Sequence, residues 1–231
     1  MFFDPLYMMF MAPGLILALI ATVKTRMTFS RYSRVGAASG LTGAQAARRL
    51  LDSQGARDVQ IEEVDGFLSD HYDPTSRTLR LSPDVYGSSS LSAIGVACHE
   101  AGHALQHATD YAWLGMRTAL VPATQFGNFG SYIFIMLGMF IGSLKLFLIG
   151  VILFSVVVLF SLITLPVEWD ASARAKRLMV WSGIVSHDEQ EDAAKVLNAA
   201  FLTYVASAVT ALLTLLYYLM RSGLLGGRRN D

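Results

Sequence analysis

The sequence contains very little cysteine and little charge. Cys98 is the single cysteine among 231 residues, which excludes an internal disulfide and a zinc site built from several thiolates. A lone cysteine is compatible with a reducing compartment. Charged residues make up 16% of the chain and balance to a net charge of zero. A neutral chain lacks the excess positive charge that attracts nucleic acid, so we expect no nucleic-acid partner.

Long apolar runs take the place of charge. Hydrophobic residues make up 53% of the chain and the mean hydropathy is +0.45, which is more apolar than an ordinary soluble domain. Residues 6–23 and 199–220 carry no charge, and residues 126–166 carry only Lys145. The run 126–166 is about twice the length of one membrane-spanning helix, so it predicts two spans joined by a turn at residues 142–145. We therefore predict a mainly α-helical integral membrane protein with four transmembrane helices.

A secretory signal peptide is the alternative for the first run. Such a peptide has basic residues before its apolar stretch and a small-residue cleavage site after it. Here Asp4 precedes the run, Lys24 and Arg26 follow it, and its end has no Ala-x-Ala site. The order of charges therefore favours a transmembrane helix.

The main polar segment, residues 26–125, has the pattern of a small α+β unit. We expect a helix at residues 44–51, three strands at residues 59–64, 67–72 and 78–82, and a second helix at residues 91–109. Thr42 and Gln45 match a capping box at the start of the first helix. In residues 78–82, Leu79 and Leu81 alternate with polar residues, which predicts one buried and one exposed face.

A second polar segment, residues 167–198, separates the third and fourth spans. Residues 168–178 have a helical pattern that continues the third span, and Ser186 with Glu189 forms a second capping box. We expect the C-terminal residues 226–231 to be disordered. The predicted domains are a first transmembrane helix (1–25), a catalytic domain (26–125) and a transmembrane hairpin (126–166). A ligand-bearing segment with a connecting helix (167–198) and a last transmembrane helix with its tail (199–231) follow.

The clearest chemical signal is the sequence His-Glu-Ala-Gly-His at residues 99–103. Residues four apart share one face of a helix, so His99 and His103 can reach one metal ion. Glu100 is offset by one residue, which places its carboxylate beside the metal, where it can act as the catalytic base. The pattern predicts one Zn²⁺ ion and a hydrolytic site.

Two histidines leave zinc short of ligands, because a hydrolytic site needs a third protein ligand and an open position for water. Glu168, Asp170 and His107 are the candidates. His107 lies one turn beyond His103, where it cannot readily complete a tetrahedron. Two membrane crossings separate the histidines from Glu168, and an even number returns the chain to the same side.

Several segments together resemble the YugP-type family of membrane zinc metallopeptidases. They are residues 66–74, 79–82, 96–106, 166–172 and 193–204. More distantly, the chain is similar to the HtpX and CAAX-prenyl protease group, in which a Glu after a membrane hairpin is the third zinc ligand. The resemblance implies a zincin-like (gluzincin) domain, a bacterial plasma-membrane location and Glu168 as the third ligand. That group has an Asp four residues after this Glu, whereas this chain has Ser172 there and Asp170 two residues after.

Other residues have weaker roles in this interpretation. Asp170 is a candidate partner of the metal ligands. His71 and Tyr72 could stabilise an oxyanion or only organise the turn that follows them. The strand at residues 79–82 could pair with an extended peptide substrate if it lies at a sheet edge.

The distribution of Lys and Arg predicts which side holds the catalytic domain. Basic residues cluster at residues 24–34 and 174–177, on the side of the histidines, and fewer lie near residues 145 and 221–229. The positive-inside rule therefore favours a cytoplasmic catalytic domain.

The sequence predicts a membrane-embedded zinc endopeptidase that acts on peptides or proteins, including membrane proteins. A catalytically silent metal-binding scaffold or assembly factor is the alternative, although a pure metal binder has no need of Glu100. An intramembrane protease is disfavoured because the helix of His99 is too polar to face lipid. A metal transporter is disfavoured because Lys145 is the one ionisable residue within the spans.

Overall fold

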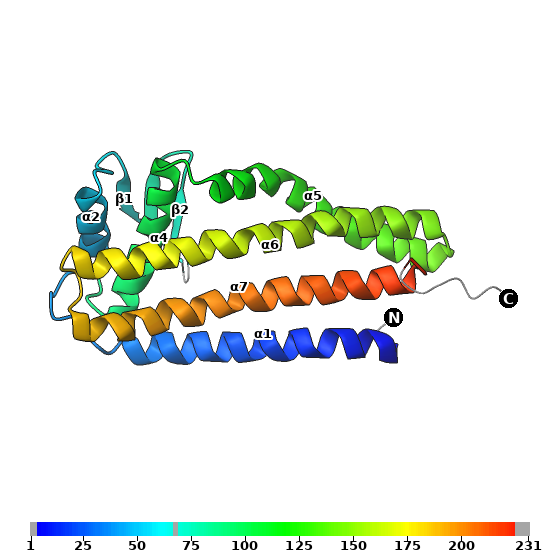
Figure 1. The fold of residues 1–231 in the computed structure, drawn as a ribbon, viewed down its shortest axis with the longest axis horizontal. Coiled ribbons are helices and arrows are strands. Elements are labelled where there is room, and N and C mark those ends of the chain that lie inside the picture. Colours follow the sequence, from blue (N-terminus) through cyan, green and yellow to red (C-terminus); the bar gives the residue numbers. More distant parts are fainter. Residues whose placement is uncertain (1–3, 67–68, 225–231) are drawn as a thin grey trace. The chain divides into compact units, whose positions relative to one another are not determined.

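The computed structural model describes residues 4–66 and 69–224. The described chain is mainly helical, with one small sheet (Figure 1). Its elements in order are α1 (Pro5–Tyr32), α2 (Gly43–Ser53), β1 (Gln60–Glu63), β2 (His71–Asp73), β3 (Thr78–Leu81), α3 (Pro83–Tyr86), α4 (Leu91–Ala108), α5 (Ala112–Ile141), α6 (Leu144–Trp181) and α7 (His187–Arg221). The chain divides into two compact units, one of residues 1–20, 116–166 and 204–231 and one of residues 21–115 and 167–203.

The unit of residues 21–115 and 167–203, called the polar unit below, contains the sheet. Its strand order is β1-β3-β2, with β1 parallel and β2 antiparallel to β3. Its core gathers buried side chains of α2, α4 and the sheet together with those of residues 175–197. Both predicted capping boxes form, that of Thr42 with Gln45 and that of Ser186 with Glu189.

The sheet corrects two predictions about residues 78–82. Leu79 and Leu81 are buried as expected, but Thr78 and Ser82 are buried as well and Arg80 is half-buried. Both buried polar side chains have partners, because the Thr78 hydroxyl donates to the Ser76 carbonyl oxygen and the hydroxyl of Ser82, one residue beyond β3, donates to Asp70. A central strand also has no free edge, so β3 cannot be the strand that pairs with a substrate peptide.

The other unit, called the apolar unit, is formed by parts of α1, α5, α6 and α7. Three helices of the described chain are long and apolar enough to cross a membrane, namely α1, α6 and α7. Many of their large apolar side chains point outward, including Leu19 at 65% exposed and Ile152 at 68%. Outward apolar side chains on long helices suit lipid rather than water.

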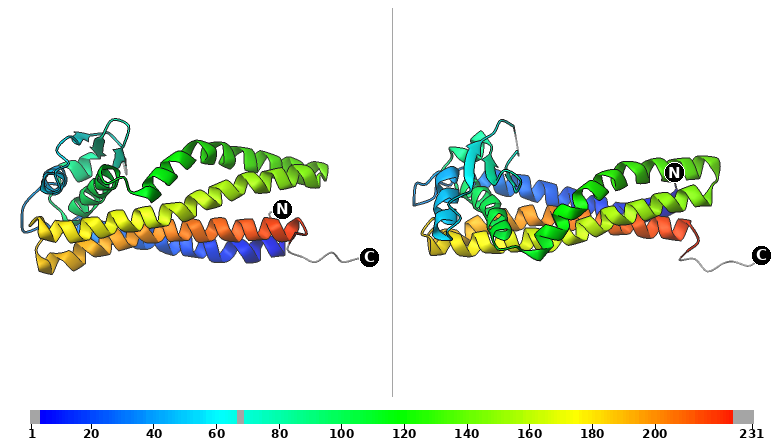
Figure 2. Two further views of the ribbon diagram at one scale, coloured as in Figure 1. Left: turned by 45° about the horizontal axis from the view of Figure 1, so that its top comes forward. Right: turned by 90° about the horizontal axis from the view of Figure 1, so that it is seen from above.

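Helix α5 contains the predicted second span but is not among these three helices. The polar side chains of Gln125 and Asn128 interrupt its apolar stretch. Its second half packs closely on α6, because a Cβ at Gly138 would clash with the Phe147 backbone and a Cβ at Gly150 would lie 2.7 Å from the Ile135 nitrogen. Glycine contacts of this kind are typical of membrane helix pairs. Figure 2 shows the α5–α6 hairpin in two orientations.

Other predicted bounds shift by a few residues. The strand predicted at residues 67–72 is β2, which begins at His71, and residues 67 and 68 lie outside the described part. The predicted tail at residues 226–231 also lies outside it. The turn after the second span is shorter than expected, because α5 ends at Ile141, α6 begins at Leu144 and Gly142 takes a positive φ of 74°.

Candidate metal centre

Helix α4 carries His99 and His103 on one face. It begins after Ser90, whose hydroxyl oxygen accepts a hydrogen bond from the Ala93 backbone nitrogen at 3.2 Å. This N-cap satisfies one of the free donors at the helix start. Cys98 lies fully buried in the core beside this face, as expected of a small packing residue.

Gly102 allows α4 to approach α6 closely enough for the histidines to meet Glu168. A Cβ at Gly102 would lie 2.6 Å from the carbonyl oxygen of Ala171. Only glycine leaves room for that backbone contact. The small residues inside the His-Glu-x-x-His sequence therefore set the helix–helix distance.

The three predicted ligands converge on one point. Glu168 Oε2 lies 3.2 Å from His99 Nε2 and 3.6 Å from His103 Nε2. The candidate ligand atoms of the three residues all lie within 4.8 Å of one another, and Glu168 is only 1% exposed. Ligands of tetrahedral zinc with bonds of about 2.0–2.1 Å are separated by roughly 3.3 Å. Two imidazoles and a carboxylate at this spacing fit a zinc ion.

The second nitrogen of each imidazole has its own partner. Ser172 Oγ lies 3.1 Å from His99 Nδ1, and Gln106 Oε1 accepts a hydrogen bond from His103 Nδ1 at 2.9 Å. A proton held on Nδ1 leaves the Nε2 lone pair for a metal. Both rings are thereby fixed with Nε2 facing Glu168.

Gln106 also connects the ligands to the predicted Asp170. Its Nε2 donates to the Val167 carbonyl oxygen at 2.8 Å and to Asp170 Oδ2 at 2.9 Å. Arg174 Nε donates to the same Asp170 oxygen at 2.6 Å. Asp170 thus contacts the ligands through Gln106, which the sequence analysis did not assign to the site. The spacing of three residues from His103 was the available signal, because i and i+3 share a helix face.

The pKa values of the two glutamates in the site are shifted in opposite directions. Burial raises the pKa of Glu100, and His99 and His103 offset this only in part. Burial alone would also raise the pKa of Glu168, but the hydrogen bonds from His103 and His99 hold that pKa well below its usual range. Environments that push two carboxyl pKa values apart are typical of acid–base sites. Glu168 is set to remain an anion, and Glu100 to carry a proton more readily.

The remaining predicted residues lie in β2 or beside it. Tyr72 Oη lies 2.8 Å from His107 Nδ1, and His71 Nδ1 lies 2.6 Å from the Ser69 carbonyl oxygen. Neither side chain has a hydrogen bond or ion pair with His99 or Glu168 in the part of the chain that the structure describes. Asp73 organises the following turn through Thr75 and Ser76.

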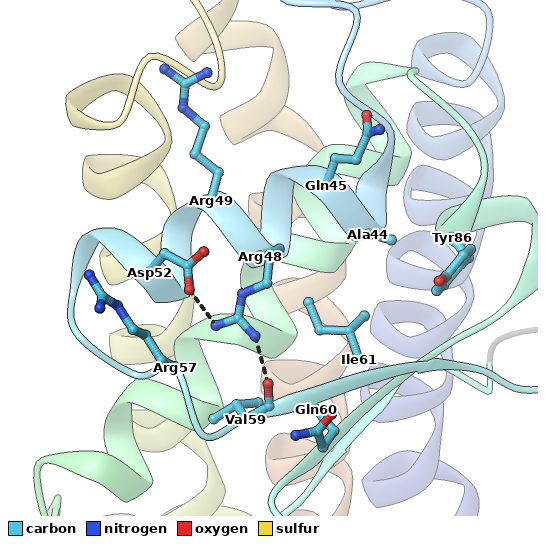
Figure 3. Close-up of a pocket in the computed structure, with 10 residues that line it drawn as sticks. All are labelled: Ala44, Gln45, Arg48, Arg49, Asp52, Arg57, Val59, Gln60, Ile61 and Tyr86. Carbon is cyan, nitrogen blue, oxygen red and sulfur yellow. Dashed lines mark hydrogen bonds and ion pairs between the residues drawn. The ribbon is translucent and has the colours of Figure 1, made fainter.

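A separate hollow of about 660 Å³ lies between α2 and β1 (Figure 3). Its central side chain, Arg48, donates to the Val59 carbonyl oxygen at 2.7 Å and forms an ion pair with Asp52 at 2.9 Å. A second hydrogen bond joins Arg48 to the Ala56 carbonyl oxygen at 2.9 Å. Arg48 therefore fixes the loop between α2 and β1, and the hollow contains none of the candidate metal ligands.

Comparison with known proteins agrees with this chemistry. Residues 7–223 match the family described as "Putative neutral zinc metallopeptidase". A similar protein of Bacillus subtilis (strain 168), named "Putative membrane protease YugP", is 49% identical over 200 residues, which cover 87% of this chain and 89% of that protein. No solved structure matches the chain. The chain therefore belongs to this zinc metallopeptidase family, as its motifs predicted.

Proposed function

We propose that the chain is a membrane-embedded zinc endopeptidase. The observation that carries this proposal is the convergence of His99, His103 and Glu168, with both imidazoles held through Nδ1 so that Nε2 faces the carboxylate. A glutamate as third ligand would make the polar unit a gluzincin-like domain. The family and the name of the similar Bacillus subtilis protein support the same reaction class.

Three residues would bind zinc, and Glu100 would act as the general base. Zinc bound to His99, His103 and Glu168 would lower the pKa of a water and polarise the peptide carbonyl. Glu100 takes the proton of the attacking water and passes it to the leaving amine nitrogen as the C–N bond breaks. Its carboxylate makes no side-chain hydrogen bond within residues 4–66 and 69–224, so it is free to face a water.

Four membrane crossings are part of the proposal. The apolar part of α6 is long enough to cross a membrane and precedes Glu168 in the same helix. His99 lies before α5, yet it is close to Glu168. If α6 crosses the membrane, α5 must cross it too, because only an even number of crossings returns the chain to the same side. The close glycine contacts between α5 and α6 support this pairing.

The basic residues near the span ends support a cytoplasmic catalytic domain in a bacterial plasma membrane. Peptides or proteins, including other membrane proteins, are the proposed substrates. The bilayer is then the environment of α1, α5, α6 and α7.

The Glu100→Gln variant tests the mechanism. Detergent-purified, zinc-loaded protein should cleave denatured casein, and Glu100→Gln should lower the rate at least about a hundredfold, because general base catalysis contributes 10²–10⁴-fold. The variant should keep its zinc, because Glu100 is not a ligand. Glu63→Gln, at an exposed residue of β1, is the matched control and should behave as wild type.

Undiminished cleavage by Glu100→Gln would refute the assigned base. Tightly bound zinc without cleavage of casein or of any other denatured protein would favour the alternative of a metal-binding scaffold.

A further inference from the structure

The apolar unit contains a cavity of about 420 Å³ between α5, α6 and α7. Eight of its eleven lining residues are polar, although the helices that form it are largely apolar. Five of the eight, Asn128, Ser161, Thr164, Tyr204 and Ser207, lie within the apolar runs 126–166 and 199–220, where polar side chains are costly unless they serve a partner or a pathway. This cavity is therefore a candidate binding site.

Two amide side chains of α5, Gln125 and Asn128, are the centre of the polar lining. They lie three residues apart, on one face of the helix. Both are exposed, and neither side chain has a hydrogen bond among the residues that the structure describes. Polar residues that join membrane helices bond across the interface. These two amides do not, so they remain available to a ligand.

The hydroxyl groups of the cavity complete this pattern. Thr124, Ser161 and Thr164 each donate to a carbonyl oxygen of their own helix, at 2.8 Å in each case. Their oxygens keep the capacity to accept another hydrogen bond. Apart from Arg117, the polar lining thus combines uncharged donors and acceptors.

Such a lining matches the groups of a peptide backbone. An intact helix satisfies its own N–H and C=O groups, whereas an unwound segment in a membrane must find partners elsewhere. A lipid phosphate would require cationic side chains, and Arg117 is the one Lys or Arg in this lining. The amide and hydroxyl groups favour polypeptide over phosphate.

We propose that this cavity binds an unwound segment of a membrane-embedded polypeptide. The inference rests on the proposed peptidase function and names its substrate class, membrane proteins whose helix is broken near the membrane face. A peptidase needs an extended chain, and partners for an unwound backbone lower the cost of exposing one.

Photo-cross-linking tests the binding without requiring cleavage. The full-length Glu100→Gln protein would carry benzoylphenylalanine at Val157 on the α6 wall, at Ser207 on the α7 wall, or at exposed Phe126 outside the cavity. Each protein would be reconstituted in phosphatidylcholine vesicles with a single-span Leu/Ala peptide, either intact or broken by a Gly-Pro pair near one end. From Val157 and Ser207, the broken span should label about tenfold more than the intact span, as expected for one or two hydrogen bonds.

Equal labelling of both peptides from Val157 and Ser207, or labelling of lipid alone, would overturn the proposal. Phe126 should label both peptides equally, because it lies outside the cavity lining. A preference for the broken span at Phe126 as well would show that the selectivity belongs to the helix surface and not to the cavity.

Cleavage separates this proposal from the proposed function. In zinc-loaded protein, Gln125→Leu with Asn128→Leu should lower the rate on the broken-span peptide relative to casein about tenfold. Phe126→Leu with Phe129→Leu should leave that ratio unchanged. An unchanged ratio in the amide variant would refute the cavity proposal alone. Cleavage of neither substrate by wild type would refute the peptidase function, and the cross-linking result would still decide on the cavity.

Discussion

The two histidines of the candidate metal centre have different hydrogen-bond partners. His99 is paired with the hydroxyl of Ser172, and His103 with the amide of Gln106. Neither partner is a carboxylate, although a carboxylate is a common partner of metal-bound histidines. A neutral partner should make His99 a weaker ligand than a carboxylate partner would.

Replacing Ser172 measures its contribution. Ser172→Ala should lower zinc affinity about tenfold, because partners of metal-bound histidines contribute 10–100-fold. Ser172→Asp should restore or exceed the wild-type affinity. Competition with a zinc chelator gives the affinities. Ser155→Ala is the control on the same helix, since the Ser155 hydroxyl bonds only to the Val151 carbonyl oxygen. Unchanged affinity in Ser172→Ala would mean that this hydroxyl does not position His99.

The sequence pattern identified the candidate ligands but not the side chains that bond to their second ring nitrogens. His99, Glu100 and His103 follow from spacing within one helix, which local geometry determines. Ser172 and Gln106 act across the contact between α4 and α6, whose register depends on tertiary packing. Asp170 shows the difference, because it lies near the ligands as predicted but contacts Gln106 and Arg174 instead of a histidine.

At the scale of elements, the closest contact between α4 and α6 is set by a missing side chain. The carbonyl oxygen of Ala171 occupies the space that a Cβ of Gly102 would need. The same helix has a second glycine, Gly95, where the nearest atom to an added Cβ would lie 3.8 Å away. Both glycines therefore lie in the same helix, but only Gly95 has room for a side chain.

This pair of glycines provides a matched test. Gly102→Ala should push α4 from α6, lower zinc affinity at least about tenfold and cost about 1–3 kcal/mol of stability, as overpacking does. Gly95→Ala should bind zinc normally and be as stable or more stable, because alanine favours a helix. Chelator competition and thermal unfolding in detergent give both quantities. Wild-type zinc affinity in Gly102→Ala would show that the ligands do not depend on this contact.

The predictions of local structure were confirmed where residues close in sequence determine it. They were wrong where burial depends on residues distant in sequence. Both capping boxes formed because each involves residues three apart on one chain segment. The burial of Thr78 and Ser82 was not predicted, because alternation along the strand does not reveal that the Ser76 carbonyl and the Asp70 carboxylate serve as their partners.

At the scale of the whole molecule, the number of membrane crossings determines whether the site can form on one side. Helices α1, α6 and α7 are apolar enough to span a membrane, and α5 is not among them. The sequence predicted four spans from length and charge alone. The polar residues Gln125 and Asn128 make α5 the exception, and the same residues line the proposed substrate cavity.

Cysteine labelling tests the topology. Cys98 is buried, and burial raises the pKa of its thiol, so it gives little background with maleimides. Ser143→Cys, between α5 and α6, and His187→Cys, at the start of α7, should react with an impermeant maleimide from opposite sides of the membrane. External reagent should label Ser143→Cys in intact cells. Reaction of both from the same side would contradict a crossing by each helix of the α5–α6 hairpin.

The most direct test of the central claim is metal content, measured by plasma mass spectrometry on detergent-purified protein. Wild type should hold about one zinc per chain, and His99→Ala, His103→Ala and Glu168→Ala should lose it. His107→Ala, one turn along the same helix and paired with Tyr72, should retain it. Full zinc in Glu168→Ala, or no zinc in wild type after zinc is supplied, would contradict a centre built from His99, His103 and Glu168.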